Sequence, residues 1–325
     1  MESHQLEAFA AVMSAGSVTG AGKLTGRSQP AVTRLIQELE AEIGYALFDR
    51  RGPRVTPTPR AFRLYEEVER SLIGLERIRA SALAIGRDDA PPLTVAATPA
   101  LAASLVPRAL AGLSDAHAGA VQLRSASAEQ VVQALLARAA DAGIATLPLD
   151  HAALDLHYLI EAPCVVVMRR DDPLAALPVV SLEALRERRL ATVSNRYRLR
   201  RRIDDAFGQA GFAPHVALES NASLNAVMAA HAGLAIALVD PATAFGTPVS
   251  DVVTRSLDVH IPFYFGVVTA ADRRRSDAIE ALIDAILQAA LGLLPGAIRH
   301  DATRHAALLT PMAAPPPSSA KRITA

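Results

Sequence analysis

A short polar run near the N-terminus carries side chains suited to reading DNA bases, Ser28-Gln29-Pro30-Ala31-Val32-Thr33-Arg34. Glutamine can pair with adenine through two hydrogen bonds, threonine can contact a thymine methyl group, and arginine can bind guanine or a phosphate. Ser28 can cap the free amides of a helix start, and Pro30 lies where a missing N–H costs nothing. We therefore expect a DNA-binding surface made of Ser28, Gln29, Pro30, Thr33 and Arg34.

The residues around this run predict a helix-turn-helix. Apolar residues after Pro30 recur at helical spacing and turn the polar side chains outward; they are Val32, Leu35, Ile36 and Leu39. An earlier helix has one apolar face and ends at Ala15-Gly16; that face is Leu6, Phe9, Ala10 and Met13. A second short helix starts at Ser17 or Val18. The last helix of such a motif enters the major groove.

A basic hairpin tip follows the third helix, with Arg50, Arg51 and Arg54 around Gly52-Pro53. We expect these arginines to contact phosphates and to position the protein on DNA; a solvated basic loop is the alternative. Residues 23–63 hold eight basic and four acidic residues in a chain of zero net charge. The positive charge is thus concentrated where DNA would bind.

The run SQPAVTRLIQELEAEIGYALFDR resembles the N-terminal domain of the LysR-type transcriptional regulators. The resemblance implies a winged helix-turn-helix at 1–58 and a homodimer, or a tetramer, bound to an interrupted palindrome in double-stranded DNA. It also implies a small-molecule effector, with RNA polymerase as a candidate partner. Within the family, the stretch Gly233 to Pro241 and the N-terminal HQLEAFAAVMSAGSVTGA are similar to regulators of opine use and lysine biosynthesis, which implies an amino-acid-derived effector.

One segment departs from the family pattern. Gly22, Thr25 and Arg27 stand where relatives have an alanine and apolar residues. A glycine inside a helix costs about 0.5–1 kcal/mol relative to alanine. An alternative function is therefore a metabolite-binding protein with impaired DNA binding.

The next segment predicts a long helix at 59–86 that serves as a dimerisation linker. It carries a heptad-like apolar seam, which needs a partner helix; the seam is Tyr65, Val68, Leu72, Leu75 and Ala82. Residues 87–92 are polar and proline-containing, which is typical of a hinge.

Beyond residue 93, strands and helices alternate, which predicts α/β lobes with parallel strands and helices on both faces. The expected strands are 93–97, 121–124, 143–146, 164–168, 190–193, 215–218, 235–239 and 263–269; the expected helices are 100–117, 128–139, 182–188, 199–210, 224–231 and 276–291. The chain returns to the first lobe near 263. Two lobes joined by crossing strands resemble the periplasmic-binding-protein-like effector domain of the LysR family, here at 93–295. The Pro-, Ala- and Ser-rich tail at 296–325 is expected to be disordered.

Ligands of open α/β sheets bind beyond the carboxyl ends of the strands. Hydroxyl, amide and guanidinium groups there suit a small molecule that bears a carboxylate. The positions are Thr98, Pro99, Ser125, Ser127, Thr146, Ser194, Asn195 and Arg196. The alternative is that the serines only cap helices, which would fit a ligand-independent repressor.

Other functions find little support in the sequence. There is no metal-spaced His or Cys cluster and no catalytic motif, so neither a metal, nor a cofactor, nor an enzyme activity is predicted. The single cysteine, Cys164, excludes an internal disulfide and fits a reducing cytoplasm. The N-terminus lacks a secretory signal pattern. The apolar stretch 278–294 carries Glu280 and Asp284 and is better interpreted as a packed helix than as a membrane span.

Overall fold

The computed structural model describes residues 1–49, 55–85, 92–113, 120–149, 151–194, 198–272 and 275–309. Several expected site residues lie outside these ranges: Arg50, Arg51, Arg54, Asn195 and Arg196. The same is true of the expected hinge except Pro92, and of residues 310–325 in the expected tail. The chain divides into two compact units, 1–91 and 92–325, which are described separately.

The first unit is a winged helix-turn-helix followed by a long helix. Its elements are α1 (Ser3–Ala15), α2 (Val18–Thr25), α3 (Gln29–Ile43), β1 (Phe48–Asp49), β2 (Thr56–Pro57) and α4 (Pro59–Ile85). Helices α1 to α3 each end at a glycine with a left-handed backbone, and Ser17 and Ser28 cap α2 and α3 through their side chains. The boundaries expected from capping and turn residues are thus confirmed.

The core of the first unit forms around Phe9. Its ring centroid lies 5.8 Å from that of Phe48 and 6.3 Å from that of Tyr65 on α4. The expected stripe of α3 is buried in full: Val32, Leu35, Ile36 and Leu39. On α1 the prediction was partly wrong, because Ala8, Phe9 and Val12 are buried whereas Leu6, Ala10 and Met13 only flank the core. Ala8 and Val12 share this core with Ala21 of α2 and Val32 of α3.

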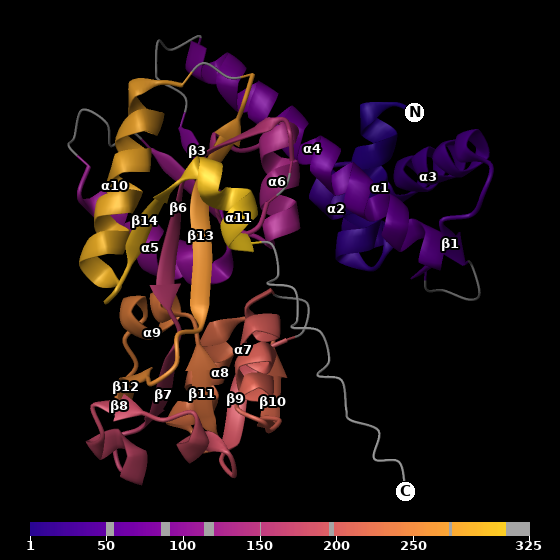
Figure 1. Cartoon of the computed structure of the whole chain (residues 1–325). Coiled ribbons are helices and arrows are strands. Elements are labelled where there is room, and N and C mark those ends of the chain that lie inside the picture. The colour runs from indigo at the N-terminus through magenta and orange to yellow at the C-terminus, as the bar shows by residue number, and fades with distance from the viewer. Residues whose placement is uncertain are drawn as a thin grey trace, which may run out of the picture. The chain divides into compact units, whose positions relative to one another are not determined.

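The second unit contains two sheets, each covered by helices (Figure 1). The first has the strand order β14-β6-β13-β5-β3-β4. Its strands are β3 (Leu93–Ala97), β4 (Val121–Ser125), β5 (Ala142–Thr146), β6 (Leu154–Pro163), β13 (Pro262–Ala270) and β14 (Ile298–Asp301). On one face, Val95 and Ala97 pack in a core with α5 (Pro99–Ala111) and α10 (Asp277–Leu293), while Ala96 faces α6 (Ala128–Leu136).

The second sheet has the order β10-β9-β11-β7-β12-β8. Its strands are β7 (Val165–Arg169), β8 (Val179–Val180), β9 (Arg189–Val193), β10 (His215–Ser220), β11 (Ile236–Val239) and β12 (Val252–Leu257). Helix α7 (Arg198–Gln209) covers one face, and α8 (Ser223–His231) covers the other. The short helix α9 (Pro241–Gly246) follows β11. The predicted two-lobed α/β architecture is confirmed, with the chain crossing between sheets at β6–β7 and at β12–β13. The expectation of parallel sheets was partly wrong, because β13 runs antiparallel to β5 and β6, and β7 runs antiparallel to β11 and β12. The strands on which the chain crosses or returns between the lobes enter the sheets in the opposite direction.

Some expected elements differ from those observed. The segment 182–188 forms only the short 3-10 helix η2 (Glu183–Leu185), and α5 and α6 end at Ala111 and Leu136, earlier than expected. Strands β6, β8 and β12 and the helix α9 were not expected. Residues 296–309 were expected to be disordered, but they form β14, the 3-10 helix η3 (Ala302–Arg304) and α11 (His305–Leu309). Composition suggested disorder there, whereas pairing of β14 with β6 orders the segment.

Candidate functional site

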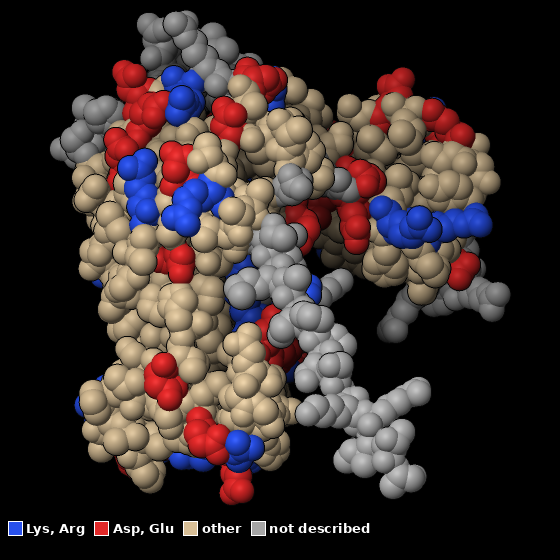
Figure 2. All heavy atoms as spheres, in the orientation of Figure 1, with Lys and Arg blue, Asp and Glu red and all other residues tan. Residues whose placement is uncertain are grey.

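The polar residues expected to read DNA lie together at the N-terminal end of α3. Ser28, Gln29, Pro30 and Arg34 are exposed, and Thr33 is half-buried. Ser28 Oγ accepts a hydrogen bond from the Ala31 N–H at 3.4 Å. The Ser28 side chain therefore caps the N-terminus of α3. Figure 2 shows a row of basic side chains on this unit.

Two contacts within the unit orient the exposed side chains. The Thr19 hydroxyl on α2 lies 3.4 Å from Gln29 Oε1, and the Thr33 hydroxyl donates to the Gln29 carbonyl at 3.0 Å. The hydroxyl proton of Thr33 is thus used within the helix, while its methyl group and its oxygen lone pairs remain available to a partner. Arg34 Nε lies 2.7 Å from Glu38 Oε1. This exposed ion pair spans one helical turn, and a DNA base or phosphate would have to replace Glu38 as the partner of Arg34.

Gly22 is explained by the turn between α2 and α3. A Cβ atom at this position would lie 2.7 Å from the Arg27 carbonyl oxygen, and the Gly22 carbonyl accepts the Arg27 N–H at 2.9 Å. Thr25 donates its hydroxyl to the Ala21 carbonyl at 2.8 Å, and Arg27 is exposed. Glycine at position 22 thus lets the turn after α2 pack directly against the backbone of that helix. The two polar residues of the departure, Thr25 and Arg27, are respectively hydrogen-bonded and exposed.

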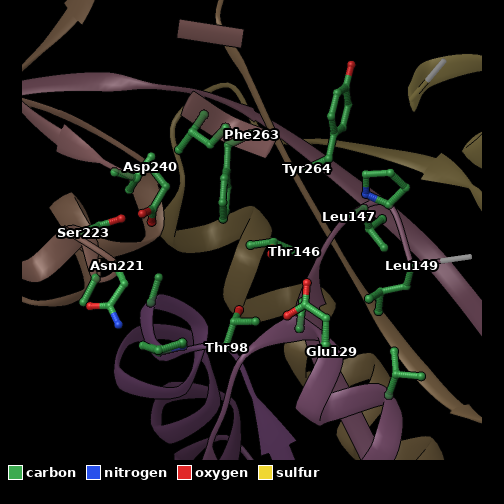
Figure 3. A pocket seen from close by; sticks show the side chains of 18 of the residues that line it. Thr98, Glu129, Thr146, Leu147, Leu149, Asn221, Ser223, Asp240, Phe263 and Tyr264 are labelled. Atoms are coloured by element: carbon green, nitrogen blue, oxygen red, sulfur yellow. The ribbon is translucent and has the colours of Figure 1, made fainter. Parts of the chain in front are cut away.

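A cavity of about 310 Å³ lies between the ends of the two sheets of the second unit (Figure 3). The first lobe contributes residues that follow β3 and β5, residues of α6 and the start of β13, and the second lobe contributes residues of α7 and residues that follow β10 and β11. Its polar and aromatic lining includes Thr98, Glu129, Thr146, His151, Arg202, Asn221, Ser223, Asp240, Phe263 and Tyr264.

Thr98 has an unusual environment in this cavity. Thr98 is 3% exposed, and within the part of the chain that the structure describes its Oγ1 has no hydrogen-bond partner, although it occupies the N-cap position of α5, where a threonine usually caps. A buried hydroxyl without a partner costs free energy. Thr98 also lines the cavity, next to the free amides of the first turn of α5.

Charged side chains of both signs reach the cavity. The Arg202 guanidinium lies 4.7 Å from the Tyr264 ring centroid and is half-buried, and Glu129 points into the cavity from α6 (Figure 3). Asp240 is buried and caps α9, accepting the Thr243 N–H at 2.8 Å. Burial raises the pKa of Asp240 above its usual range, and hydrogen bonds from Ser223 and Thr243 only partly offset this effect.

The expected ligand residues are only partly brought together. Thr98, Pro99 and Thr146 line the cavity, whereas Ser125, Ser127 and Ser194 do not. Ser127 caps α6 in a reciprocal pair with Gln130, which is the alternative left open by the sequence. Arg202, Glu129 and Asp240 were missed. Asp240 follows the strand β11, so the rule that selected Thr98 could have selected it too; Arg202 lies within a helix and gave no such signal.

Residues 3–61 match the family model described as the bacterial regulatory helix-turn-helix protein, lysR family, and residues 86–291 match that of the LysR substrate binding domain. This chain belongs to the LysR family. It is a DNA-binding transcriptional regulator whose activity is modulated by a small-molecule effector, and members of the family are regulators rather than enzymes. LysR regulators bind DNA as oligomers.

Similar proteins include two named regulatory proteins and one solved structure. The regulatory protein NocR of Agrobacterium fabrum is 31% identical, with 88% of this chain and 97% of the relative covered. The octopine catabolism/uptake operon regulatory protein OccR of Rhizobium meliloti is 33% identical over 75% of this chain and 81% of its own length. The crystal structure of CbnR has a TM-score of 0.73 at 22% identity, covering 89% of this chain and 99% of that chain. Among the described residues, no helix is both long and apolar enough to span a membrane.

Proposed function

We propose that this LysR family member responds to an amino-acid-derived effector bearing a carboxylate, bound in the cavity between the two lobes. The observation that carries the proposal is that Arg202 of one lobe and Thr98 of the other both line this cavity, and that the Thr98 hydroxyl has no hydrogen-bond partner among the described residues. A carboxylate accepts hydrogen bonds from a guanidinium and a hydroxyl, and such charge-assisted bonds are strong. Glu129 offers a partner for an ammonium or a second cationic group of the same molecule.

The relatives support a particular class of such molecules. OccR is described as a regulator of octopine catabolism, and octopine is an N-carboxyalkyl amino acid with carboxylates and cationic groups. A cavity with basic and acidic side chains suits this kind of charge pattern. Among the residues selected from sequence, Thr98, Pro99 and Thr146 belong to this site, with Arg202, Glu129 and Asp240 added.

On the DNA side, Gln29, Thr33 and Arg34 read bases from the start of α3, and Ser28 and Pro30 fix that start. Arg50, Arg51 and Arg54 contact phosphates. Two copies joined through α4 form a dimer that reads an interrupted palindrome. Two such dimers pair into a tetramer. The DNA-bound protein contacts RNA polymerase. The regulator acts in the cytoplasm and has no enzyme activity.

Two alternatives remain testable. Impaired DNA binding was suggested by Gly22, Thr25 and Arg27, but the close turn at Gly22 and the paired Thr25 hydroxyl favour a folded reader. A ligand-independent repressor was suggested by the capping serines, but the unpartnered Thr98 hydroxyl favours a ligand.

DNA reading is tested by a salt-titrated mobility shift on the DNA upstream of the regulator's own gene, with Arg34→Gln and Glu38→Gln as a matched pair. Both substitutions break the same ion pair. Arg34→Gln is expected to weaken specific binding by about 1–3 kcal/mol. Glu38→Gln frees Arg34 and removes a negative charge, so binding should stay equal or tighten. Equal losses in both variants would show that the pair matters for folding rather than for DNA.

Effector binding is tested by calorimetry with free amino acids and N-carboxyalkyl amino acids, octopine among them. Binding of one of them that weakens in Thr98→Val and changes the DNA footprint would support the proposal. If no carboxylate binds and the footprint never changes, the ligand-independent repressor becomes the better explanation.

A further inference from the structure

The C-terminal segment, residues 298–309, lies beyond the part of the chain that matches the family model, which ends at residue 291. Its strand β14 pairs antiparallel with β6, with Ile298 opposite Glu161 and His300 opposite Leu159. The segment therefore occupies the edge of the first sheet that β6 would otherwise present (Figure 1).

Glu161 links this segment to the crossing strands. One carboxylate oxygen lies 2.8 Å from His300 Nε2 and the other 2.7 Å from His260 Nε2, just before β13. Arg304 Nη1 lies 3.2 Å from His300 Nδ1. A guanidinium only donates, so Nδ1 accepts and Nε2 carries the proton that is given to Glu161. Burial raises the pKa of Glu161, but the hydrogen bonds from His260 and His300 outweigh burial, so its pKa lies below the usual range.

Tyr264 on β13 continues the link to the cavity. Its hydroxyl points away from the cavity (Figure 3), and Tyr264 lies directly opposite Glu161 in the pairing of β13 with β6. Burial and the charge of Glu161 raise the pKa of Tyr264. Its ring stacks with the Arg202 guanidinium of the other lobe, and its carbonyl accepts the Leu147 N–H at 2.9 Å. Tyr264 thus joins Glu161, the cavity wall and the second lobe.

A second, apolar contact leads from the segment to the same wall. Leu308 packs against the cluster of Leu147, Leu159 and Tyr264. Leu147 and Tyr264 also line the cavity. The C-terminal segment therefore reaches the cavity wall in two ways, through Glu161 and through Leu308. Both routes lead to Leu147 and Tyr264, whose backbones are hydrogen-bonded to each other.

We propose that residues 298–309 hold the Leu147–Tyr264 wall in its binding conformation, so that docking of this segment and occupancy of the cavity stabilise each other. Such coupling is reciprocal, because each event must favour the other by the same factor. His300 and Leu308 are positioning residues, since they act through Glu161 and Tyr264. The ligand part of the proposal rests on the cavity being the effector site; the wall part does not.

The wall part is tested without ligand by amide hydrogen exchange in the full chain. Leu308→Ala should accelerate exchange of the Leu147 amide by about tenfold through local opening. The matched control is Ile298→Ala, on the same segment but with a side chain that is 52% exposed, which should leave that amide unchanged. His300→Leu should accelerate exchange, whereas His300→Gln, which keeps a donor for Glu161, should restore the wild-type rate.

Two shortened chains complete this experiment. A chain ending at Gly296 lacks the segment and should show fast exchange in 142–149, whereas a chain ending at Leu309 should behave as wild type. If Leu308→Ala and the chain ending at Gly296 both keep wild-type exchange at Leu147 while β6 opens, the segment only covers the sheet edge and the proposal is wrong.

The ligand part uses octopine as the probe. Octopine bound to wild type should slow exchange of the β14 amides, and Leu308→Ala should weaken its binding by about tenfold, a typical allosteric coupling. Binding that is equal in both proteins would overturn the coupling. Failure of octopine to bind wild type would count against the proposed effector class, and the exchange experiment would still decide whether the segment holds the wall.

Discussion

In the first unit, the candidate DNA-binding residues from Ser28 to Arg34 all lie at the start of one helix, α3. The cavity of the second unit is instead lined by residues from several elements, namely α5, α6, α7, α8 and the cap of α9. A site on one helix depends mainly on local capping and spacing. A site between two lobes depends on long-range packing and on how the lobes approach each other. The first can therefore be changed by single side chains, while the second responds to anything that moves a wall.

The largest effect expected from this comparison comes from the core of the first unit. Leu39 is fully buried, and Leu39→Ala should lower the free energy of unfolding of residues 1–91 by about 2–5 kcal/mol. DNA binding should fall with it, while ligand binding by the second unit is retained. The control is Leu24→Ala in the same unit, where the side chain is 65% exposed. Urea unfolding followed by domain-specific hydrogen exchange measures both, and equal destabilisation of both units would contradict their independence.

A smaller effect is expected from the cation of the cavity. Arg202→Gln should weaken binding of a carboxylate effector by about 1.5–3 kcal/mol, the usual contribution of a hydrogen bond to a charged group. Arg201 is exposed and does not line the cavity, so Arg201→Gln is a matched control. Calorimetry on both variants, with DNA binding in the absence of ligand as a reference, checks the result. A loss that appears equally in Arg201→Gln would point to net charge rather than to a contact.

The same substitution at two glycines should have opposite effects in the two units. Gly22→Ala places a Cβ atom 2.7 Å from the Arg27 carbonyl oxygen and should destabilise the first unit by about 1–3 kcal/mol. Gly208 on α7 has open space around its Cβ position, so Gly208→Ala should stabilise the second unit by about 0.5–1 kcal/mol. Thermal unfolding of both variants and of the wild type measures these changes in stability. A stabilising Gly22→Ala would mean that the turn is looser than observed.

The difference between the two sites also explains what could be predicted from sequence. The α3 stripe and its cap at Ser28 follow from local spacing, so both were found. Thr98 and Thr146 were found because they lie at the carboxyl ends of buried strands. The strands can be recognised from the local sequence, and their carboxyl ends meet at one edge of the sheet. Arg202 was missed because its orientation toward Tyr264 arises only when the lobes meet. Strand β14 was missed because its stability comes from pairing with β6, more than a hundred residues earlier in the chain.

A small effect, and the one that most sharply separates stability from binding, is expected at Thr98. Because its buried hydroxyl has no partner, Thr98→Val should stabilise the free protein by about 1 kcal/mol while it weakens effector binding. Thr192 is the matched control: it is equally buried, but its hydroxyl donates to the Leu238 carbonyl at 2.9 Å, so Thr192→Val should destabilise the protein by about 1 kcal/mol. Thermal unfolding with and without ligand measures both. A Thr98→Val protein that is less stable without ligand would indicate that the hydroxyl already has a partner, and the strongest argument for ligand binding in the cavity would then be lost.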